Sequence, residues 1–206
     1  MAAEAREILR PDLAIVADMV PTGARVLDLG CGTGELLAFL QSHKQVRGYG
    51  LDTDPDAITA GVARGVNVVE QNLDLGLNNF PDDSFDFVVM TEALQAVRYP
   101  AQLIDDMLRI GRECVVTFPN FGHWSCRAQL SLRGRMPVAH HLPHRWYDTP
   151  NIHLCTFADF EALCRDKNVS ILERFVVDNR YRNRALINYA PNLFGTIAFY
   201  HLGRPS

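Results

Sequence analysis

The feature that most limits how this chain can fold is a glycine-rich turn between a short apolar run and a predicted helix. The apolar run, Val26-Leu27-Asp28-Leu29, has the pattern of a buried strand, and the helix opens at Glu35. The turn carries glycines at alternate positions, Gly30, Gly32 and Gly34. Glycine adopts the backbone dihedrals of such a turn and lets a ligand approach the main chain. Asp52 ends the next apolar run, so the sequence predicts the nucleotide-binding half of a doubly wound α/β fold, with Asp52 accepting hydrogen bonds from two ribose hydroxyls.

The spacing of the glycines separates two classes of nucleotide ligand. A dinucleotide-binding turn has the pattern Gly-x-Gly-x-x-Gly, and its third glycine would fall at Glu35 here. A pyrophosphate at that position would meet a carboxylate, and Asp28 adds further negative charge near the turn. This arrangement favours a ligand with a cationic group and no phosphate, and it argues against a nicotinamide-dependent dehydrogenase. The alternative is an ordinary strand–turn–helix connection whose glycines serve packing only, and the presence of Asp52 argues against it.

Composition limits the class of protein further. The chain has 206 residues, 48% of them hydrophobic and 21% charged, which suits one globular domain over residues 1–206. No apolar run approaches the ~20 residues of a membrane span, and the N-terminus lacks the pattern of a signal peptide. The five cysteines form no Cys-x-x-Cys pair, which is typical of free thiols in a reducing cytoplasm. The net charge of −4 argues against a nucleic-acid partner, and we expect a cytoplasmic protein that does not associate with membranes.

Strands and helices alternate along the first 119 residues. Helices are expected at 11–19, 35–42, 55–64 and 100–110, the last closed by Gly111, and strands at 24–29, 46–51, 66–70, 85–90 and 114–118. After an irregular insertion at about 120–153, a capping box at Thr156 opens another helix, and strands follow at 169–177 and 196–202. The pattern predicts a seven-stranded, mostly parallel sheet flanked by helices, with an antiparallel last pair.

The glycine turn with its acidic residues resembles the S-adenosylmethionine motif of the class I methyltransferases, which have a Rossmann-like fold. The resemblance implies that the glycines line the methionine moiety, that Asp28 faces the methionyl ammonium, and that Asp52 binds the ribose with Thr53 beside it. The adenine-contacting acid of many relatives is replaced by Asn72, which precedes Leu73, and Asp74 is a second candidate. Thr91 follows strand four, where the backbone usually meets the cofactor. Gln95 stands where many small-molecule methyltransferases have histidine, and an amide cannot act as a general base, so no catalytic residue is identified.

The chain as a whole resembles a narrower group, the methionine-biosynthesis protein MetW family of bacteria. The strings that carry this resemblance are Phe118-Pro-Asn-Phe-Gly-His-Trp124, Leu132-Arg-Gly-Arg-Met-Pro137 and residues 146–156, from Trp146-Tyr-Asp to Leu-Cys-Thr156. The resemblance implies a protein that binds S-adenosylmethionine or S-adenosylhomocysteine and acts in methionine biosynthesis as partner or regulator of a homoserine O-acyltransferase. It does not establish methyl transfer. A free-standing methyltransferase of a small molecule is the alternative.

Residues 120–153, hereafter the insertion segment, have the composition of a contact surface. Four arginines stand against a single acid, Asp148, and aromatic side chains are interleaved with them. Because Trp, Tyr and Arg dominate interface hot spots, we expect Trp124, Arg135, Trp146 and Tyr147 to contact a partner or substrate. The alternative is a lid whose aromatic side chains pack on the sheet. The segment also contains five histidines, but no pair has a zinc-ligand spacing with a matching second pair, so no metal site is expected.

Overall fold

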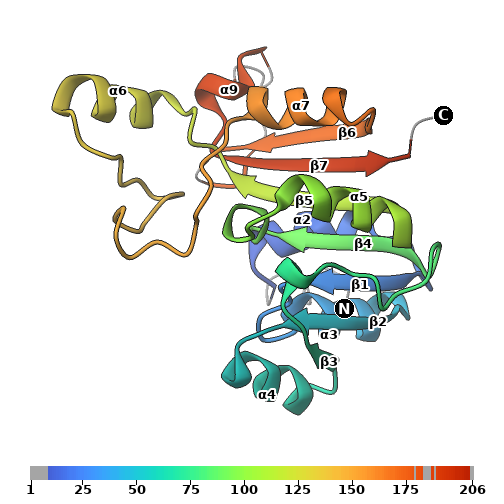
Figure 1. Cartoon of the computed structure of the whole chain (residues 1–206). Coiled ribbons are helices and arrows are strands. Elements are labelled where there is room, and N and C mark those ends of the chain that lie inside the picture. The colour runs from blue at the N-terminus through green and yellow to red at the C-terminus, as the bar shows by residue number, and fades with distance from the viewer. Residues whose placement is uncertain (1–8, 179, 183–186, 188, 205–206) are drawn as a thin grey trace. The chain divides into compact units, whose positions relative to one another are not determined.

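A computed structural model describes residues 9–178, 180–182, 187 and 189–204 (Figure 1). Residues 1–8, on which the expectation about a signal peptide rests, lie outside this description. The chain forms a seven-stranded sheet of order β3-β2-β1-β4-β5-β7-β6, which confirms the predicted mostly parallel sheet with flanking helices. It divides into two compact units, the first comprising residues 1–91 and 101–115 and the second residues 92–100 and 116–206.

The first unit contains the alternating strands and helices that precede the insertion segment. They are α2 (Pro11–Met19), β1 (Arg25–Leu29), α3 (Glu35–Lys44), β2 (Arg47–Asp52), α4 (Pro55–Ala63), β3 (Asn67–Glu70), the 3-10 turn η1 (Leu73–Leu75), β4 (Phe85–Thr91) and α5 (Pro100–Ile110). Strand β1 pairs in parallel with β2 and β4, and β2 pairs in parallel with β3. Leu27 and Leu29 are fully buried, as expected for a central parallel strand covered on both faces.

Local sequence signals determine several of these boundaries. The Asp54 side chain accepts a hydrogen bond from the amide of Asp56, and Pro55 occupies the first turn, so α4 begins where its cap and proline predict. Gly111 has a different role from the one expected. It does not close α5 with a turn, because strand β5 (Gly111–Pro119) begins at this residue. A Cβ there would lie 2.5 Å from Cγ2 of Val88, so glycine is required by close packing.

The second unit contains the end of β5, the 3-10 turn η2 (Leu94–Ala96), α6 (Trp124–Arg133), α7 (Phe157–Asp166), β6 (Ser170–Val177), α9 (Pro191–Phe194) and β7 (Ile197–Gly203). Strands β6 and β7 are antiparallel, as predicted. Its core is aromatic, since Phe118 stacks on Tyr200 and both rings contact Phe160. The predicted capping box of Thr156 and Asp159 is present at the start of α7.

The insertion segment is less irregular than its sequence suggests, because helix α6 occupies its first third. The helix was missed because its signals are weak. Its N-cap is His123, which is not among the favoured capping residues, and Cys126 is its one buried residue, so it shows no apolar stripe. In the described part of the chain no helix is long and apolar enough to cross a membrane. All five cysteines are free thiols.

Candidate cofactor-binding and partner-binding sites

The glycine turn lies at the carboxyl end of β1 and is fastened to the end of β2. The amides of Gly30 and Cys31 both donate to the carbonyl oxygen of Leu51, at 2.8 and 3.0 Å. Gly30, Gly32 and Gly34 have φ values of +71°, +51° and +71°, which L side chains adopt only with strain. A Cβ at Gly32 would meet nothing within 4 Å. The turn therefore needs glycine for its dihedrals, since the turn itself leaves open space where a Cβ at Gly32 would stand.

Asp52 connects this turn to the start of α4. One carboxylate oxygen, Oδ2, accepts a hydrogen bond from the amide of Gly32 at 2.7 Å. The other, Oδ1, accepts from the amides of Thr53 and Asp54 at 2.8 and 3.0 Å. Since each carboxylate oxygen has two lone pairs, Oδ2 retains capacity for a hydroxyl donor. The predicted residue is thus at the turn, and it organises the turn as well as being suited to bind a ligand.

Asp28 lies inside β1, opposite Gly50 of β2 and Val89 of β4. Its side chain is buried, with the residue 1% exposed, and its Oδ1 has no hydrogen-bond partner among the described residues. Burial, followed by the charge of Asp52, raises its pKa from 3.8 to about 7. A buried carboxylate without a counter-charge is unfavourable, and a cation placed beside it would stabilise the ionised form. Asp28 therefore has the chemistry of a recognition group for a cationic ligand.

The remaining predicted cofactor residues follow the neighbouring strands at the same edge of the first unit's sheet. Asp52 pairs with Glu70 at the end of β2 and β3, and Asn72 comes two residues after Glu70. Asp28 pairs with Val89 of β4, and Thr91, the last residue of β4, comes two residues after Val89. The Asn72 side-chain oxygen accepts from the amide of Asp74 at 2.9 Å and caps η1, whose first residue is Leu73. This oxygen therefore has a local structural role that the sequence did not indicate.

Two further residues near the turn matter for its shape and charge. The Cys31 side chain occupies the space above Gly50, because a Cβ on Gly50 would lie 2.3 Å from Cys31 Sγ. Burial and the charges of Asp28 and Asp52 raise the pKa of the Cys31 thiol to about 12, so it is not a reactive thiolate. Glu35 begins α3, as predicted, and leaves a carboxylate where a dinucleotide-binding turn would have its third glycine.

Gln95, in the second unit, is a structural residue that holds the end of the insertion segment. It is 2% exposed, and its Nε2 donates to the carbonyl oxygen of Pro119 and to Sγ of Cys155, both at 3.2 Å. The backbone carbonyl oxygen of Gln95 accepts hydrogen bonds from the amides of Ile152 and His153, at 2.9 and 3.0 Å. The sequence identified only what Gln95 cannot do, which is to act as a base.

The start of the insertion segment is held in a similar way by Asn120, which is fully buried. Its Nδ2 donates to the carbonyl oxygens of Asn192 and Gly195, and its Oδ1 accepts from the amide of Gly122 at 2.8 Å. The start of the segment is therefore fixed by the buried Asn120 side chain, and its end by the backbone carbonyl of the buried Gln95. Such residues are recognisable only once the fold is known, because the groups they contact are distant in sequence.

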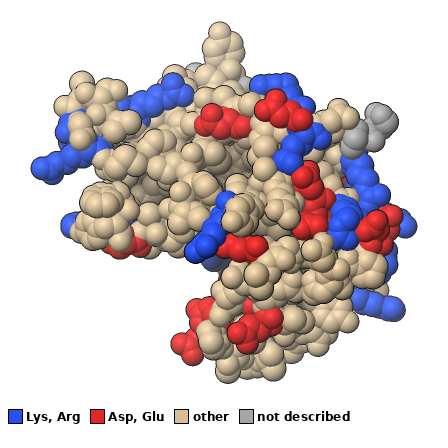
Figure 2. All heavy atoms as spheres, viewed as in Figure 1, with Lys and Arg blue, Asp and Glu red and all other residues tan. Residues whose placement is uncertain are grey.

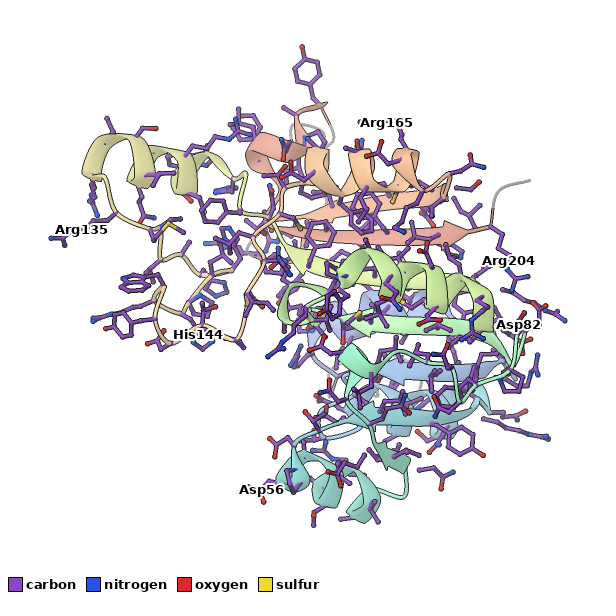
Figure 3. The ribbon with its side chains drawn as sticks, viewed as in Figure 1. Asp56, Asp82, Arg135, His144, Arg165 and Arg204 are labelled. Carbon is purple, nitrogen blue, oxygen red and sulfur yellow. The ribbon has the colours of Figure 1, made fainter. Side chains whose placement is uncertain are left out.

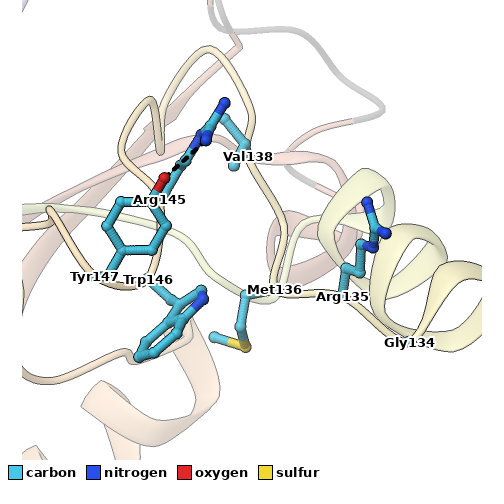
Figure 4. Close-up of a pocket in the computed structure, with 7 residues that line it drawn as sticks. All are labelled: Gly134, Arg135, Met136, Val138, Arg145, Trp146 and Tyr147. Atoms are coloured by element: carbon cyan, nitrogen blue, oxygen red, sulfur yellow. Dashed lines mark hydrogen bonds between the residues drawn. The ribbon is translucent and has the colours of Figure 1, made fainter.

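Between these fixed ends lies an open pocket of about 640 Å³, which we call the arginine–aromatic pocket (Figure 4). Its lining residues are Gly134, Arg135, Met136, Val138, Arg145, Trp146 and Tyr147. Three of the four predicted contact residues thus come together. The fourth, Trp124, is at the start of α6 beside His123 and does not line the pocket. Met136, Val138 and Arg145 were missed, because only their position in the folded loop distinguishes them.

Two of the five histidines of the segment, His123 and His141, lie together beside α6. His123 caps α6, its ring lies 5.2 Å from that of His141, and burial lowers the pKa of His123. The Cys126 Sγ lies 3.7 Å from Nε2 of His141. Among the residues that the structure describes, no three His, Cys, Asp or Glu side chains are grouped so that they could hold a metal ion.

Sequence comparison identifies one family and one curated relative. The family model described as methionine biosynthesis protein MetW matches residues 10–202. The "Bifunctional methionine biosynthesis protein MetXA/MetW" of Rhodopirellula baltica is 34% identical in an alignment 208 positions long, which covers 95% of this chain and 33% of that protein. The chain therefore spans about a third of the length of this relative.

Several solved structures with a similar fold are described as methyltransferases. An S-adenosylmethionine-dependent methyltransferase from Mesorhizobium loti superposes with a TM-score of 0.70 at 19% identity, over 95% of this chain and 98% of that chain. A chain of the complex between the Haloferax volcanii Trm112 methyltransferase activator and the putative methyltransferase gives a TM-score of 0.67 at 18% identity, over 94% and 89% of the two chains. These likenesses establish the Rossmann-like methyltransferase fold predicted from the glycine turn.

Proposed function

Because the chain belongs to the MetW family of methionine biosynthesis proteins, we propose that it binds S-adenosylmethionine or S-adenosylhomocysteine and acts with a homoserine O-acyltransferase. The observation that carries the cofactor proposal is the buried Asp28 carboxylate, whose Oδ1 has no partner in the described structure. Both ligands carry an ammonium group that would supply the missing counter-charge. A ligand with phosphates at the same place would instead meet Asp28, Glu35 and Asp52.

The other residues of the first unit fit the rest of such a ligand. Asp52 Oδ2 has a lone pair for a ribose hydroxyl, and the backbone of Gly30, Gly32 and Gly34 allows close approach because it carries no side chains. Thr53, Asn72, Leu73 and Thr91 follow β2, β3 and β4 at the same edge and would surround the nucleoside. The bound S-adenosylmethionine would supply an activated methyl group, while these residues bind and orient it.

The partner proposal rests on the insertion segment and on the fused relative. In Rhodopirellula baltica a MetW-named part and a MetXA-named part share one polypeptide, which is a natural way to keep two partners together. In the present chain the corresponding contact would be made through the arginine–aromatic pocket, which exposes residue types that dominate interfaces. The remaining alternative, a free-standing methyltransferase, would use the same cofactor site. Gln95 gives it no general base, although methyl transfer to a nucleophilic atom needs mainly proximity and orientation.

Calorimetric titration of S-adenosylhomocysteine into the purified protein tests the cofactor proposal. Asp52→Ala should weaken binding about 10–150-fold for each charged hydrogen bond that it removes. Because this change also frees the amides of Gly32, Thr53 and Asp54, Asp52→Asn is the second variant, as it removes the charge but keeps one of the two acceptor oxygens. Asp56→Ala, an exposed change on α4 (Figure 3), is the matched control and should bind normally. No binding by the unaltered protein, or equal binding by all variants, contradicts the proposal.

Analytical ultracentrifugation of the protein with the homoserine O-acyltransferase of the same organism tests the partner role. We expect a co-sedimenting complex and no transfer of a labelled methyl group to metabolites of an extract. Separate sedimentation together with labelled product would instead favour the free-standing methyltransferase.

A further inference from the structure

We propose that the arginine–aromatic pocket is the docking site for an acidic segment of the partner protein, one that inserts a single large apolar side chain between Trp146 and Met136. The proposal rests on the proposed function for the existence of a protein partner. It adds what chemistry the partner's contacting segment must have and how that segment occupies the pocket.

The lining of the pocket combines two guanidinium groups with an apolar floor. In Figure 4 the thioether of Met136 faces the indole of Trp146, and Arg145 with Tyr147 stands at one side while Arg135 stands at the other. Among the residues that the structure describes, none of those lining the pocket is acidic. A carboxylate-bearing chain that crosses it would meet arginines on both sides, and arginine binds carboxylates in a planar, bidentate geometry.

The charge of the insertion segment supports an acidic occupant. Arg127, Arg133, Arg135 and Arg145 against Asp148 give the segment a formal charge of +3, while the whole chain has −4, so the other residues sum to −7. In Figure 2 this part of the surface, at the left, carries basic side chains and little acidic surface. An excess of one sign on a local surface attracts a partner surface of the opposite sign and accelerates encounter.

The exposure of the pocket distinguishes a protein segment from other occupants. Trp146 is 72% and Tyr147 61% exposed, whereas a small-molecule site buries most of its ligand's surface. A second copy of this chain docking through the same surface would bring two segments of charge +3 together, which is unfavourable. A partner that covers the aromatic rings and neutralises the arginines satisfies both observations.

The pocket is also ordered by contacts of its own. Arg145 Nη1 donates to the Tyr147 hydroxyl at 2.7 Å, and the Trp146 and Tyr147 rings meet edge to face at 5.6 Å. On the opposite side, the Gln129 amide exchanges hydrogen bonds with both the amide and the carbonyl of Val138, at 3.3 and 3.2 Å. With Asn120 and Gln95 holding the ends of the segment, these contacts reduce the conformational entropy that is lost when a partner binds.

Titration with the homoserine O-acyltransferase, followed by fluorine NMR of 5-fluorotryptophan incorporated into this chain, tests the proposal. The chain has two tryptophans, and Trp124→Phe identifies the signal of Trp146. We expect the Trp146 signal to shift on binding. Trp146→Ala and Arg145→Glu should each weaken binding about thirty-fold or more, and raising the salt concentration should weaken the unaltered complex more than that of Arg145→Glu. Arg165→Glu makes the same charge change at an exposed site on α7 (Figure 3) and should bind normally.

The outcomes separate this inference from the proposed function. If no complex forms with the unaltered protein, the proposed partner role is wrong and this inference falls with it. If the complex forms but the pocket variants, shown to be folded by circular dichroism, bind like Arg165→Glu, only the pocket assignment is overturned. Binding of anionic lipid vesicles or RNA that the same pocket variants abolish would also overturn the assignment to a protein segment.

Discussion

Replacing Asp28 by asparagine is expected to change how the stability of this protein depends on pH. Burial, with a smaller contribution from the charge of Asp52, raises the pKa of Asp28 from 3.8 to about 7 in the folded protein. The folded protein therefore holds this proton more tightly than the unfolded chain does. By linkage, the stabilisation that the proton provides is complete below about pH 3.8, declines as the pH rises, and is lost above about pH 7.

The size of the effect follows from the two pKa values. Between pH 5 and pH 8 the unaltered protein should lose about 3 kcal/mol of unfolding free energy through Asp28, because the loss of ~1.4 kcal/mol per pH unit runs only from pH 5 to the folded pKa near 7. Asp28→Asn removes the titration, so its free energy of unfolding should rise relative to that of the unaltered protein by about this amount between the two pH values. Urea denaturation followed by circular dichroism at pH 5, 6.5 and 8 measures the difference.

A control without titration in this range is available in the same unit. Hydrogen bonds from Arg25 lower the pKa of Asp86 below 3.8, so the stabilisation from that carboxylate is fully present above about pH 4 and is lost only at lower pH. Asp86→Asn should therefore differ from the unaltered protein by a nearly constant free energy of unfolding between pH 5 and pH 8. If Asp28→Asn and the unaltered protein give parallel pH profiles, Asp28 is not a buried proton-binding group and the argument for a cationic ligand loses its basis.

The same carboxylate must ionise when it pairs with an ammonium group. Binding of S-adenosylhomocysteine at pH 6 should therefore release close to one proton, which calorimetry in two buffers of different ionisation enthalpy detects. Asp28→Asn should show no such release and weaker binding. A proton release that persists in the variant would assign the linkage to another group.

Two further predictions concern the turn and the insertion segment. Gly32→Val should lower the melting temperature through about 1–3 kcal/mol of backbone strain at φ +51°, and it should abolish the thermal shift given by S-adenosylhomocysteine. Gly32→Asn, whose side chain tolerates this conformation, should keep more of the melting temperature and more of the thermal shift. An unchanged thermal shift for Gly32→Val would exclude close approach of a ligand. Gln95→Glu should be destabilised more at pH 8 than at pH 5, because a protonated carboxyl can still donate to the Pro119 carbonyl while a buried carboxylate cannot. Urea denaturation tests this, with Gln102→Glu at an exposed position as the control. An equal loss of unfolding free energy at both pH values would contradict the prediction.

The parts of this structure that the sequence predicts are those coded by neighbouring residues. The Asp54 cap, the Thr156 capping box and the glycine turn each consist of groups within a few positions of one another, and their elements begin where expected. The positions of Asp28 and Asp52 at one turn follow from parallel pairing of β1 and β2, which a strand–turn–helix pattern implies.

The parts that the sequence does not predict depend on contacts between distant residues. Gln95 meets Pro119 and Cys155 only after the chain has folded, and nothing near it in sequence marks it as a buried support. Gly50 matters because Cys31 fills the space beside it. The aromatic and arginine content of the insertion segment indicates a contact surface, but the loop conformation decides that Arg135, Trp146 and Tyr147 share a pocket and that Trp124 does not.

The insertion segment is held at its ends by two uncharged residues, Asn120 and Gln95, while four arginines and Asp148 give the segment its formal charge of +3. Amide hydrogen bonds respond little to ionic strength, whereas attraction between exposed charges is screened within ~8–10 Å at physiological salt. Salt should therefore tune how tightly a partner is held without rearranging the surface that holds it. A loss of partner binding in salt can accordingly be interpreted as electrostatic screening, provided that circular dichroism stays constant over the same range.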